Sequence, residues 1–265
     1  MKMKKIAIAG LAALFAAPAL AHIGYKKDFG MLDGVITTGG SFTSSATSNA
    51  GWADAADNST GDALLWGDSH KSAAFLFVLT NTASVTFSVV GNASVGGATG
   101  GALLPGFSIY EGKASTVPRD PNQTSADYDT SAASKAYRET LPGGSAAYSG
   151  VWNALGNWKV GGDGDTPGDF SQLSSFTYKG SAAAAGTATT ATGSFLLGPG
   201  TYSVFVGGNN YGDYGNPLKY GFNVNLSVAA VPEPETYALL LAGLGLMSTI
   251  ARRRSRSSAN GAQQA

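Results

Sequence analysis

The sequence contains no cysteine, only two histidines and few charged residues among its 265. The absence of cysteine excludes disulfides, thiolate metal sites and cysteine nucleophiles, so stability must come from a packed core. Charged residues make up 13% of the chain, well below the usual share of about a quarter. Polarity comes instead from Ser, Thr, Asn and 37 glycines. This composition is typical of many short strands joined by turns.

Enzyme signatures are also missing. The chain has no G-x-S-x-G, no H-E-x-x-H, no P-loop and no G-x-G-x-x-G that follows a strand. Two histidines leave little scope for acid–base catalysis or a catalytic triad. The protein is therefore predicted not to be an enzyme.

The formal net charge of +0 hides an uneven distribution. Seven of the 17 basic residues lie in the two terminal segments, which leaves residues 22–231 with ten basic and fifteen acidic side chains. An acidic body without a basic patch argues against a nucleic-acid partner.

The first 21 residues have the layout of a secretory signal peptide. Three lysines lie within the first five residues, the apolar run Ile6–Ala17 follows, and Ala19–Ala21 forms a small-x-small cleavage pattern. An uncleaved anchor helix is the alternative interpretation. Cleavage after Ala21 makes His22 the first residue of the mature chain.

The C-terminal segment combines three features in a fixed order. The tetrapeptide Val231-Pro232-Glu233-Pro234 comes first, the apolar run Tyr237–Ala251 follows, and three arginines close the segment: Arg252, Arg253 and Arg254. The prolines keep the peptide before the run extended and accessible. The run is shorter than the roughly 20 residues of a comfortable membrane span, yet its aromatic and basic flanks favour a helix in the inner membrane with the arginines in the cytoplasm.

This order of features resembles the PEP-CTERM sorting signal. The resemblance implies processing by an exosortase-type membrane enzyme in a Gram-negative bacterium that makes exopolysaccharide, followed by display at the cell surface or release outside the cell. An ordinary C-terminal anchor is the alternative. The predicted organisation is a signal peptide at 1–21, a β domain at 22–230, the sorting signal with its transmembrane helix at 231–256 and a disordered tail at 257–265.

The body between these ends is predicted to be all-β. In Ser84–Val90 apolar and polar residues alternate, which is the period of a half-buried strand. Seven short β-rich runs, this one among them, are separated by turn residues: Ala73–Thr80, Ser84–Val90, Gly106–Tyr110, Ser174–Gly180, Gly193–Gly198, Thr201–Gly208 and Tyr220–Val228. They predict a single antiparallel β-sandwich or jelly-roll-like domain.

Three local predictions accompany this fold. The runs on either side of Asn81-Thr82-Ala83 are expected to pair as a hairpin. Ala132–Leu141 is the best candidate for a helix. The low-complexity stretch Gly180–Gly193 is expected to form a flexible surface loop.

The two histidines, His22 and His70, suggest one hypothesis for a metal site. A free N-terminal amine and the imidazole of the same residue chelate one metal, and a second imidazole completes a three-nitrogen histidine brace. Such nitrogens suit Cu(II), and Tyr25 or Asp68 are candidate neighbours. The alternative is that His22 merely follows the cleavage site while His70 occupies a turn-like stretch before a strand.

Two further ligand sites are weaker hypotheses. Asp163, Asp165 and Asp169 lie in the Gly-rich segment GGDGDTPGD and offer hard oxygen ligands for Ca²⁺; solvated turn aspartates are the alternative. The four tryptophans, with the many tyrosines, are either a sugar-stacking platform or core residues: Trp52, Trp66, Trp152 and Trp158.

Three functions therefore stay open. The first is an exported surface or matrix protein with a structural or adhesive role linked to exopolysaccharide or biofilm. The second is a copper-binding protein that uses His22 and His70. The third is a carbohydrate-binding module.

Overall fold

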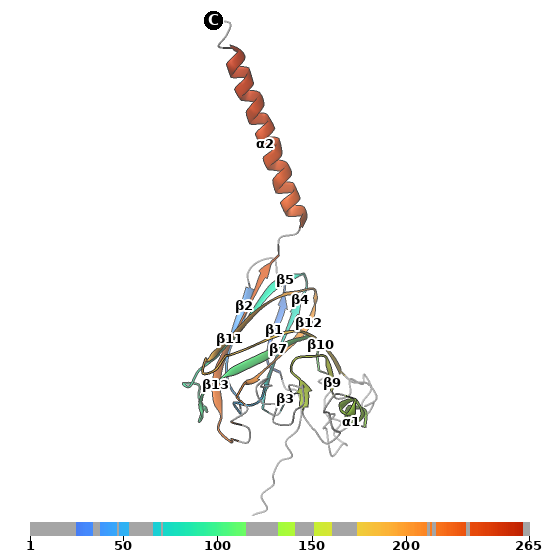
Figure 1. Cartoon of the computed structure of the whole chain (residues 1–265), viewed down its shortest axis with the longest axis vertical. Coiled ribbons are helices and arrows are strands. Elements are labelled where there is room, and N and C mark those ends of the chain that lie inside the picture. The colour runs from blue at the N-terminus through green and yellow to red at the C-terminus, as the bar shows by residue number, and fades with distance from the viewer. Residues whose placement is uncertain are drawn as a thin grey trace, which may run out of the picture.

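The computed structural model of the chain describes residues 25–33, 38–46, 48–52, 66–69, 71–114, 132–140, 151–160, 174–210, 213, 216–231 and 234–261. Two large sheets make up the body, and a long helix follows it (Figure 1). The predicted all-β class is confirmed.

The smaller sheet has the strand order β11-β5-β13-β2, and the short β6 pairs with β13. Its long strands pair antiparallel throughout, whereas β6 runs parallel to β13. The strands are β2 (Thr38–Ala46), β5 (Ala83–Gly91), β6 (Gly101–Ala102), β11 (Thr190–Leu197) and β13 (Tyr220–Ala230).

The six-stranded sheet has the order β1-β4-β12-β7-β10-β9. Its pairs are antiparallel except β1 with β4, which run parallel. The strands are β1 (Tyr25–Leu32), β4 (Ala73–Leu79), β7 (Pro105–Glu111), β9 (Trp158–Val160), β10 (Ser174–Ala183) and β12 (Gly200–Gly208). A separate pair, β3 (Trp66–Asp68) with β8 (Val151–Asn153), and the helix α1 (Ala132–Glu139) complete the body.

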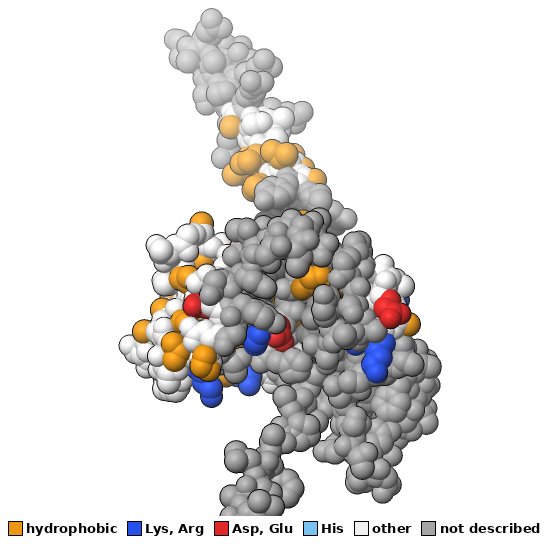
Figure 2. Space-filling model, turned by 60° about the horizontal axis from the view of Figure 1, so that its bottom comes forward, with side chains coloured by type: hydrophobic (Ala, Val, Ile, Leu, Met, Phe, Trp, Pro, Cys, Tyr) orange, Lys and Arg blue, Asp and Glu red, His pale blue; other side chains and the backbone are white. Residues whose placement is uncertain are grey.

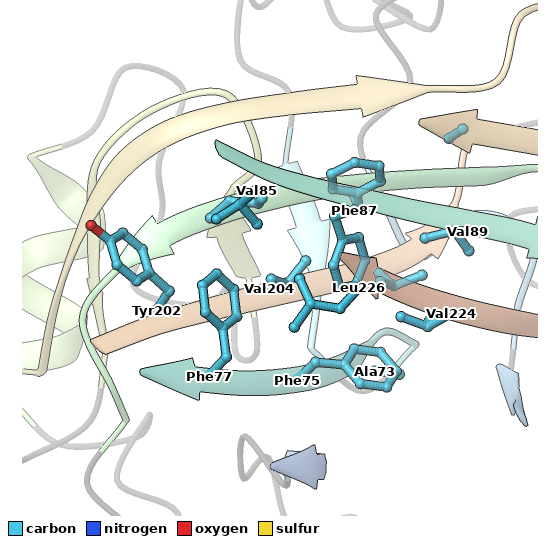
Figure 3. Packing of buried hydrophobic residues seen from close by; sticks show 14 of the residues in the cluster. Ala73, Phe75, Phe77, Val85, Phe87, Val89, Tyr202, Val204, Val224 and Leu226 are labelled. Atoms are coloured by element: carbon cyan, nitrogen blue, oxygen red, sulfur yellow. The ribbon is translucent and has the colours of Figure 1, made fainter. Parts of the chain in front are cut away.

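The main core lies between the inner faces of the two sheets (Figure 3). Strands β4, β7 and β12 contribute side chains from one side, and β5, β11 and β13 contribute them from the other. Phe77 stacks on Tyr202 with ring centroids 5.2 Å apart, and Phe87 meets Phe107 across the sheets at 5.0 Å. In β5 and β13 the alternation seen in the sequence thus places one face of the strand in this shared apolar layer.

A second core covers the outer face of the six-stranded sheet. The ring of Tyr110 on β7 lies at its centre, in edge-to-face contact with Trp152, Trp158, Phe176 and Phe205 at centroid distances of 5.7 to 6.2 Å. Strand β7 is therefore buried on both faces. The smaller sheet has no such cover among the described residues, since β5, β11 and β13 point about every second residue away from the core.

The predicted hairpin between β4 and β5 is wrong. Strand β4 pairs with β1 and β12, whereas β5 pairs with β11 and β13 in the opposite sheet. The link through Asn81 and Thr82 takes the chain across the core. Strand β4 is buried on both faces, as a central strand is, and the link lacks the Asn-Gly or Asp-Gly pair of a tight hairpin.

The flexible loop predicted at Gly180–Gly193 is also wrong. Strand β10 continues to Ala183 and β11 begins at Thr190, so only a short turn separates them. Small residues are needed here because the ring of Phe195 lies against both strands. A Cβ atom built on Gly180 or Gly193 would lie 2.4 Å or 2.6 Å from that ring.

The helix α2 (Pro234–Gly261) begins just after β13 ends (Figure 1). It contains the whole predicted apolar run and continues to Gly261, past the predicted boundary at residue 256. We call the end of the body from which α2 departs, where β4 ends and β13 reaches Ala230, the proximal end. The distal end is the opposite one, where β1 and β4 begin and β12 ends at Gly208.

Candidate functional site

The distal end gathers segments that are far apart in the sequence. The backbone N–H of Trp52 donates to the Gly208 oxygen (2.9 Å), and the N–H of Asp68 donates to the Gly51 oxygen (3.0 Å). A Cβ atom on Gly208 would lie 2.0 Å from the backbone of Asn49, so only glycine allows these segments to approach. The loop after β2, the end of β3 and the end of β12 are therefore fixed against one another.

The parallel pair of β1 and β4 begins at this end. Tyr25 is opposite Ala74 in the register, so the chain that precedes each strand leaves the sheet from the same end. His22 lies three residues before Tyr25 and His70 lies four residues before Ala74. Both histidines lie outside the described residues.

Tyr25 is anchored by hydrogen bonds of its hydroxyl. Ser203 Oγ donates to the Gly112 oxygen (2.7 Å), so the Tyr25 hydroxyl donates to Ser203 Oγ (2.7 Å) and accepts from the Ala114 N–H (2.9 Å). Burial raises the pKa of Tyr25 above its ordinary value. This neutral hydroxyl holds β1 to the sheet and is not a free ligand for a metal.

Asp68 closes a short turn at the end of β3. Its side chain forms an ion pair with Lys71 (3.2 Å), and its backbone oxygen accepts from the Lys71 N–H (3.0 Å). The carboxylate that precedes His70 in the chain thus has a cationic partner. The sequence prediction that Asp68 adjoins a metal site stays a prediction.

Asp213 is a polar hub that the sequence did not single out. Its carboxylate accepts hydrogen bonds from the side chains of Asn49 (3.0 Å), Asn210 (3.2 Å), Asn216 (3.4 Å) and Tyr220 (3.2 Å). The hydrogen bond from Asn49 is the main cause that lowers the pKa of Asp213. The only sequence signal was a segment rich in Asn, Gly and Tyr.

The amides around Asp213 are oriented by their own oxygens. The Oδ1 atom of Asn49 accepts from the Leu104 N–H (2.8 Å), and the Oδ1 atom of Asn216 accepts from the Leu218 N–H (3.1 Å). Their NH₂ groups therefore face the carboxylate. Because amide hydrogens repel a cation, this arrangement ties loops together and does not suit a metal ion.

The tryptophans are mostly core residues. Trp52, Trp152 and Trp158 are buried, whereas Trp66 is partly exposed. The Trp52 indole donates to Ser108 Oγ (2.8 Å), which donates in turn to the Ala154 oxygen (2.5 Å). The core interpretation is confirmed for these three residues, and the stacking platform that needed them exposed is wrong.

Other predicted site residues fall outside the described parts of the chain. This applies to the calcium candidates Asp163, Asp165 and Asp169, and to Pro232 and Glu233 of the sorting segment. Among the residues that the structure does describe, no group of three His, Cys, Asp or Glu side chains is placed to hold a metal ion. The copper and calcium sites stay predictions.

The proximal end carries the sorting segment. Val231 follows β13, Pro234 begins α2, and Arg252, Arg253 and Arg254 belong to the same helix. The apolar side chains of α2 are exposed, as for Leu239 (74%), and Figure 2 shows them gathered on the helix. Within the described part of the chain, no helix has both the length and the apolar character needed to cross a membrane.

Comparison with solved structures finds distant similarity. The surface-associated copper-binding protein CorA, important in copper acquisition by Methylomicrobium album BG8, is 13% identical (TM-score 0.44) over 71% of this chain and 92% of its own. The secreted protein MopE of Methylococcus capsulatus, in which an oxidized tryptophan facilitates copper binding, is 19% identical (TM-score 0.41) over 77% of this chain and 87% of its own.

No curated protein matches the chain significantly. A protein-family model matches at the proximal end, over residues 230–255, and its description is the PEP-CTERM protein-sorting motif. The match starts at the last residue of β13 and includes the Pro-Glu-Pro segment, the apolar run and the three arginines. The chain therefore carries a PEP-CTERM sorting signal directly after its β body.

Proposed function

We propose that the chain is an exported protein that an exosortase-type enzyme cleaves at its sorting signal and that is displayed at the cell surface or in the extracellular matrix. We further propose that its β body binds copper(II) at the distal end. The position of the signal supports the first part. Because β13 ends at Ala230, cleavage near residues 231–235 removes no strand from the body.

The observation that carries the copper proposal is the parallel pairing of Tyr25 with Ala74. Neighbouring strands lie about 4.8 Å apart. The chain from Tyr25 back to His22 spans at most about 10 Å, and the chain from Ala74 back to His70 at most about 14 Å. These short tethers leave the sheet at the same end, so the two imidazoles can meet.

The nitrogen donors fit the metal. The amine and imidazole of His22 form a chelate, and the imidazole of His70 supplies a third nitrogen, a set that favours Cu(II). These groups bind only when deprotonated, so affinity falls as the pH drops below the ordinary pKa of an α-amine, about 8, and falls further below that of imidazole, about 6.5. The Tyr25 hydroxyl stays bound to Ser203 and takes no part.

The test is copper titration of the mature protein, followed by electron paramagnetic resonance. A chain that starts at His22 should bind one Cu(II) with a nitrogen-rich spectrum. The variant His70→Ala, or one extra glycine ahead of His22, should weaken binding at least tenfold. Ser69→Ala is the matched control and should bind normally. Equal affinity in all four proteins would refute the brace.

A structural or adhesive role in exopolysaccharide or biofilm is the second candidate function. The two filled cores favour it, because the large aromatic side chains serve packing at both faces of the six-stranded sheet. Host cells that lack the protein should then lose biofilm mass, and the His70→Ala variant should restore it in full. Failure of that variant to restore biofilm would contradict a purely structural role.

A further inference from the structure

The outer face of the smaller sheet has an unusual composition. Strands β2, β5, β11 and β13 contain no Asp, Glu, Lys, Arg or His residue at all. The pairing registers align Thr192, Ser88, Asn225 and Ser41 in one row across the middle of this face. We call the outward side of these four strands the hydroxyl face.

A strand with one solvated face normally alternates apolar and polar residues, so the polarity of that face alone needs no explanation. The complete lack of charge is more informative, because even in this chain 13% of all residues are charged. The contrast lies within this molecule, since β1 of the other sheet carries Lys26, Lys27 and Asp28 in succession. The hydroxyl face is therefore set apart from ordinary solvated surface.

The hydroxyl groups on this face are ordered in pairs. Thr86 bonds Ser194 and Ser88 bonds Thr192, each at 2.8 Å between hydroxyl oxygens. A mutual bond uses one of the two protons, so each pair keeps one donor and several lone pairs directed outward. Strands repeat about every 4.8 Å, which makes a regular array of neutral donors and acceptors.

We propose that the hydroxyl face binds a neutral polysaccharide. An uncharged polymer of hydroxyl-bearing rings offers the same repeating donors and acceptors, and it needs no cation or anion to neutralise it. A polyanion would need the lysines and arginines that these strands lack. A second copy of the chain is a poorer partner, because the centre of a stable protein interface is apolar.

The apolar exceptions fit this proposal. Val90 lies toward one end of the hydroxyl face, and Leu196 and Ala229 lie in one row toward the other end, so the middle rows are polar. A single hydrogen bond to a sugar contributes little free energy, because it replaces hydrogen bonds to water. Retention of a polysaccharide therefore depends on contacts from several rows of this face to the same polymer. The proposal rests on the exported location proposed above but not on copper.

The experiment is native gel electrophoresis of the full chain through gels that contain hydroxyethyl cellulose, dextran or galactomannan, with alginate as an acidic comparison. At least one neutral polymer should slow the wild-type protein at least twofold relative to a polymer-free gel, and alginate should not. Asn225→Lys places a charge in the central row and should abolish the retardation. Thr177→Lys is the matched control, since it adds the same charge on an exposed position of β10.

Triple alanine replacement of Ser88, Thr192 and Asn225 separates lost hydrogen bonds from added charge and should also abolish retardation. Thermal melting checks that each variant is folded. Normal mobility of the wild type in all three neutral polymers, or equal retardation of Asn225→Lys, would overturn the proposal. A sedimentation coefficient that falls in Asn225→Lys, without any polysaccharide effect, would assign the face to a second copy instead. Copper binding by Asn225→Lys should be unchanged, so the two proposals fail independently.

Discussion

The two ends of the β body are built in different ways. At the distal end, segments from three parts of the sequence are joined through Asn49, Trp52 and Asp213. At the proximal end the chain leaves β13 and continues into α2, whose described side chains are largely exposed. One end depends on tertiary contacts, whereas the other carries a linear signal that an enzyme reads. Mutations should therefore affect stability at the distal end and sorting at the proximal end.

The largest expected effect is at Trp52. Its indole is buried against Gly106 and donates to Ser108, so Trp52→Ala leaves a cavity and takes away the donor from which the Ser108 hydroxyl accepts. We expect a loss of about 3–5 kcal/mol in the free energy of unfolding, measured by denaturant titration. Trp52→Phe keeps most of the packing and should lose far less. An equal loss in both variants would show that the hydrogen bond, not the buried area, dominates.

A glycine pair gives the next comparison between the ends. Gly208→Ala at the distal end forces a methyl group into the Asn49 backbone, whereas Gly198→Ala near the proximal end meets nothing within 4 Å. The first should cost about 1–3 kcal/mol or more, and the second should be nearly neutral. Thermal melting of both proteins checks this, and similar melting temperatures would contradict the close packing at the distal end.

A smaller effect is expected on the pH dependence of stability, through the carboxylate of Asp213. The folded-state pKa of Asp213 is lowered mainly by its hydrogen bond from Asn49, so the unfolded chain binds the proton more readily. Its contribution to stability is present above the unfolded pKa of about 4 and is lost as the pH falls through the lower folded pKa. Asp213→Asn should make the free energy of unfolding less dependent on pH below about pH 4. An unchanged acid slope would mean that the carboxylate is not held as described.

The smallest expected effect is at the proximal end. A chain that stops after Ala230 lacks α2 and the sorting signal but keeps every strand. Its melting temperature should equal that of the full chain within about 2 °C, because the helix adds little to either core. A clear drop would show that α2 packs on the body and would remove the contrast between the two ends.

The sequence predicted strands well where apolar and polar residues alternate, as in β5 and β13. It missed β2 because TGGSFTSSA has a single large apolar residue, Phe42, and becomes a strand by pairing with β13. Period two shows which residues share a face but not which strands pair, so the passage of the chain between sheets at Asn81 was not foreseen.

The candidate site also depends on long-range pairing that local sequence patterns do not reveal. His22 and His70 were singled out by their scarcity and by the cleavage site, which are local features. The proposed contact between them depends on β1 running parallel to β4, a long-range pairing that no local pattern encodes. The Asp213 hub was missed for a related reason, since Asn49 lies 164 residues away in the chain.

The most direct test of this account is the intact mass of the protein recovered from its native host, under native and then denaturing conditions. We predict a denatured chain that begins at His22 and ends near residues 231–235, with the mass of one copper ion added in the native spectrum. A mass that still includes Arg252–Arg254 would contradict processing at the sorting signal. A chain that begins elsewhere, or that begins at His22 and takes up no copper when copper is supplied, would contradict the proposed function of the distal end.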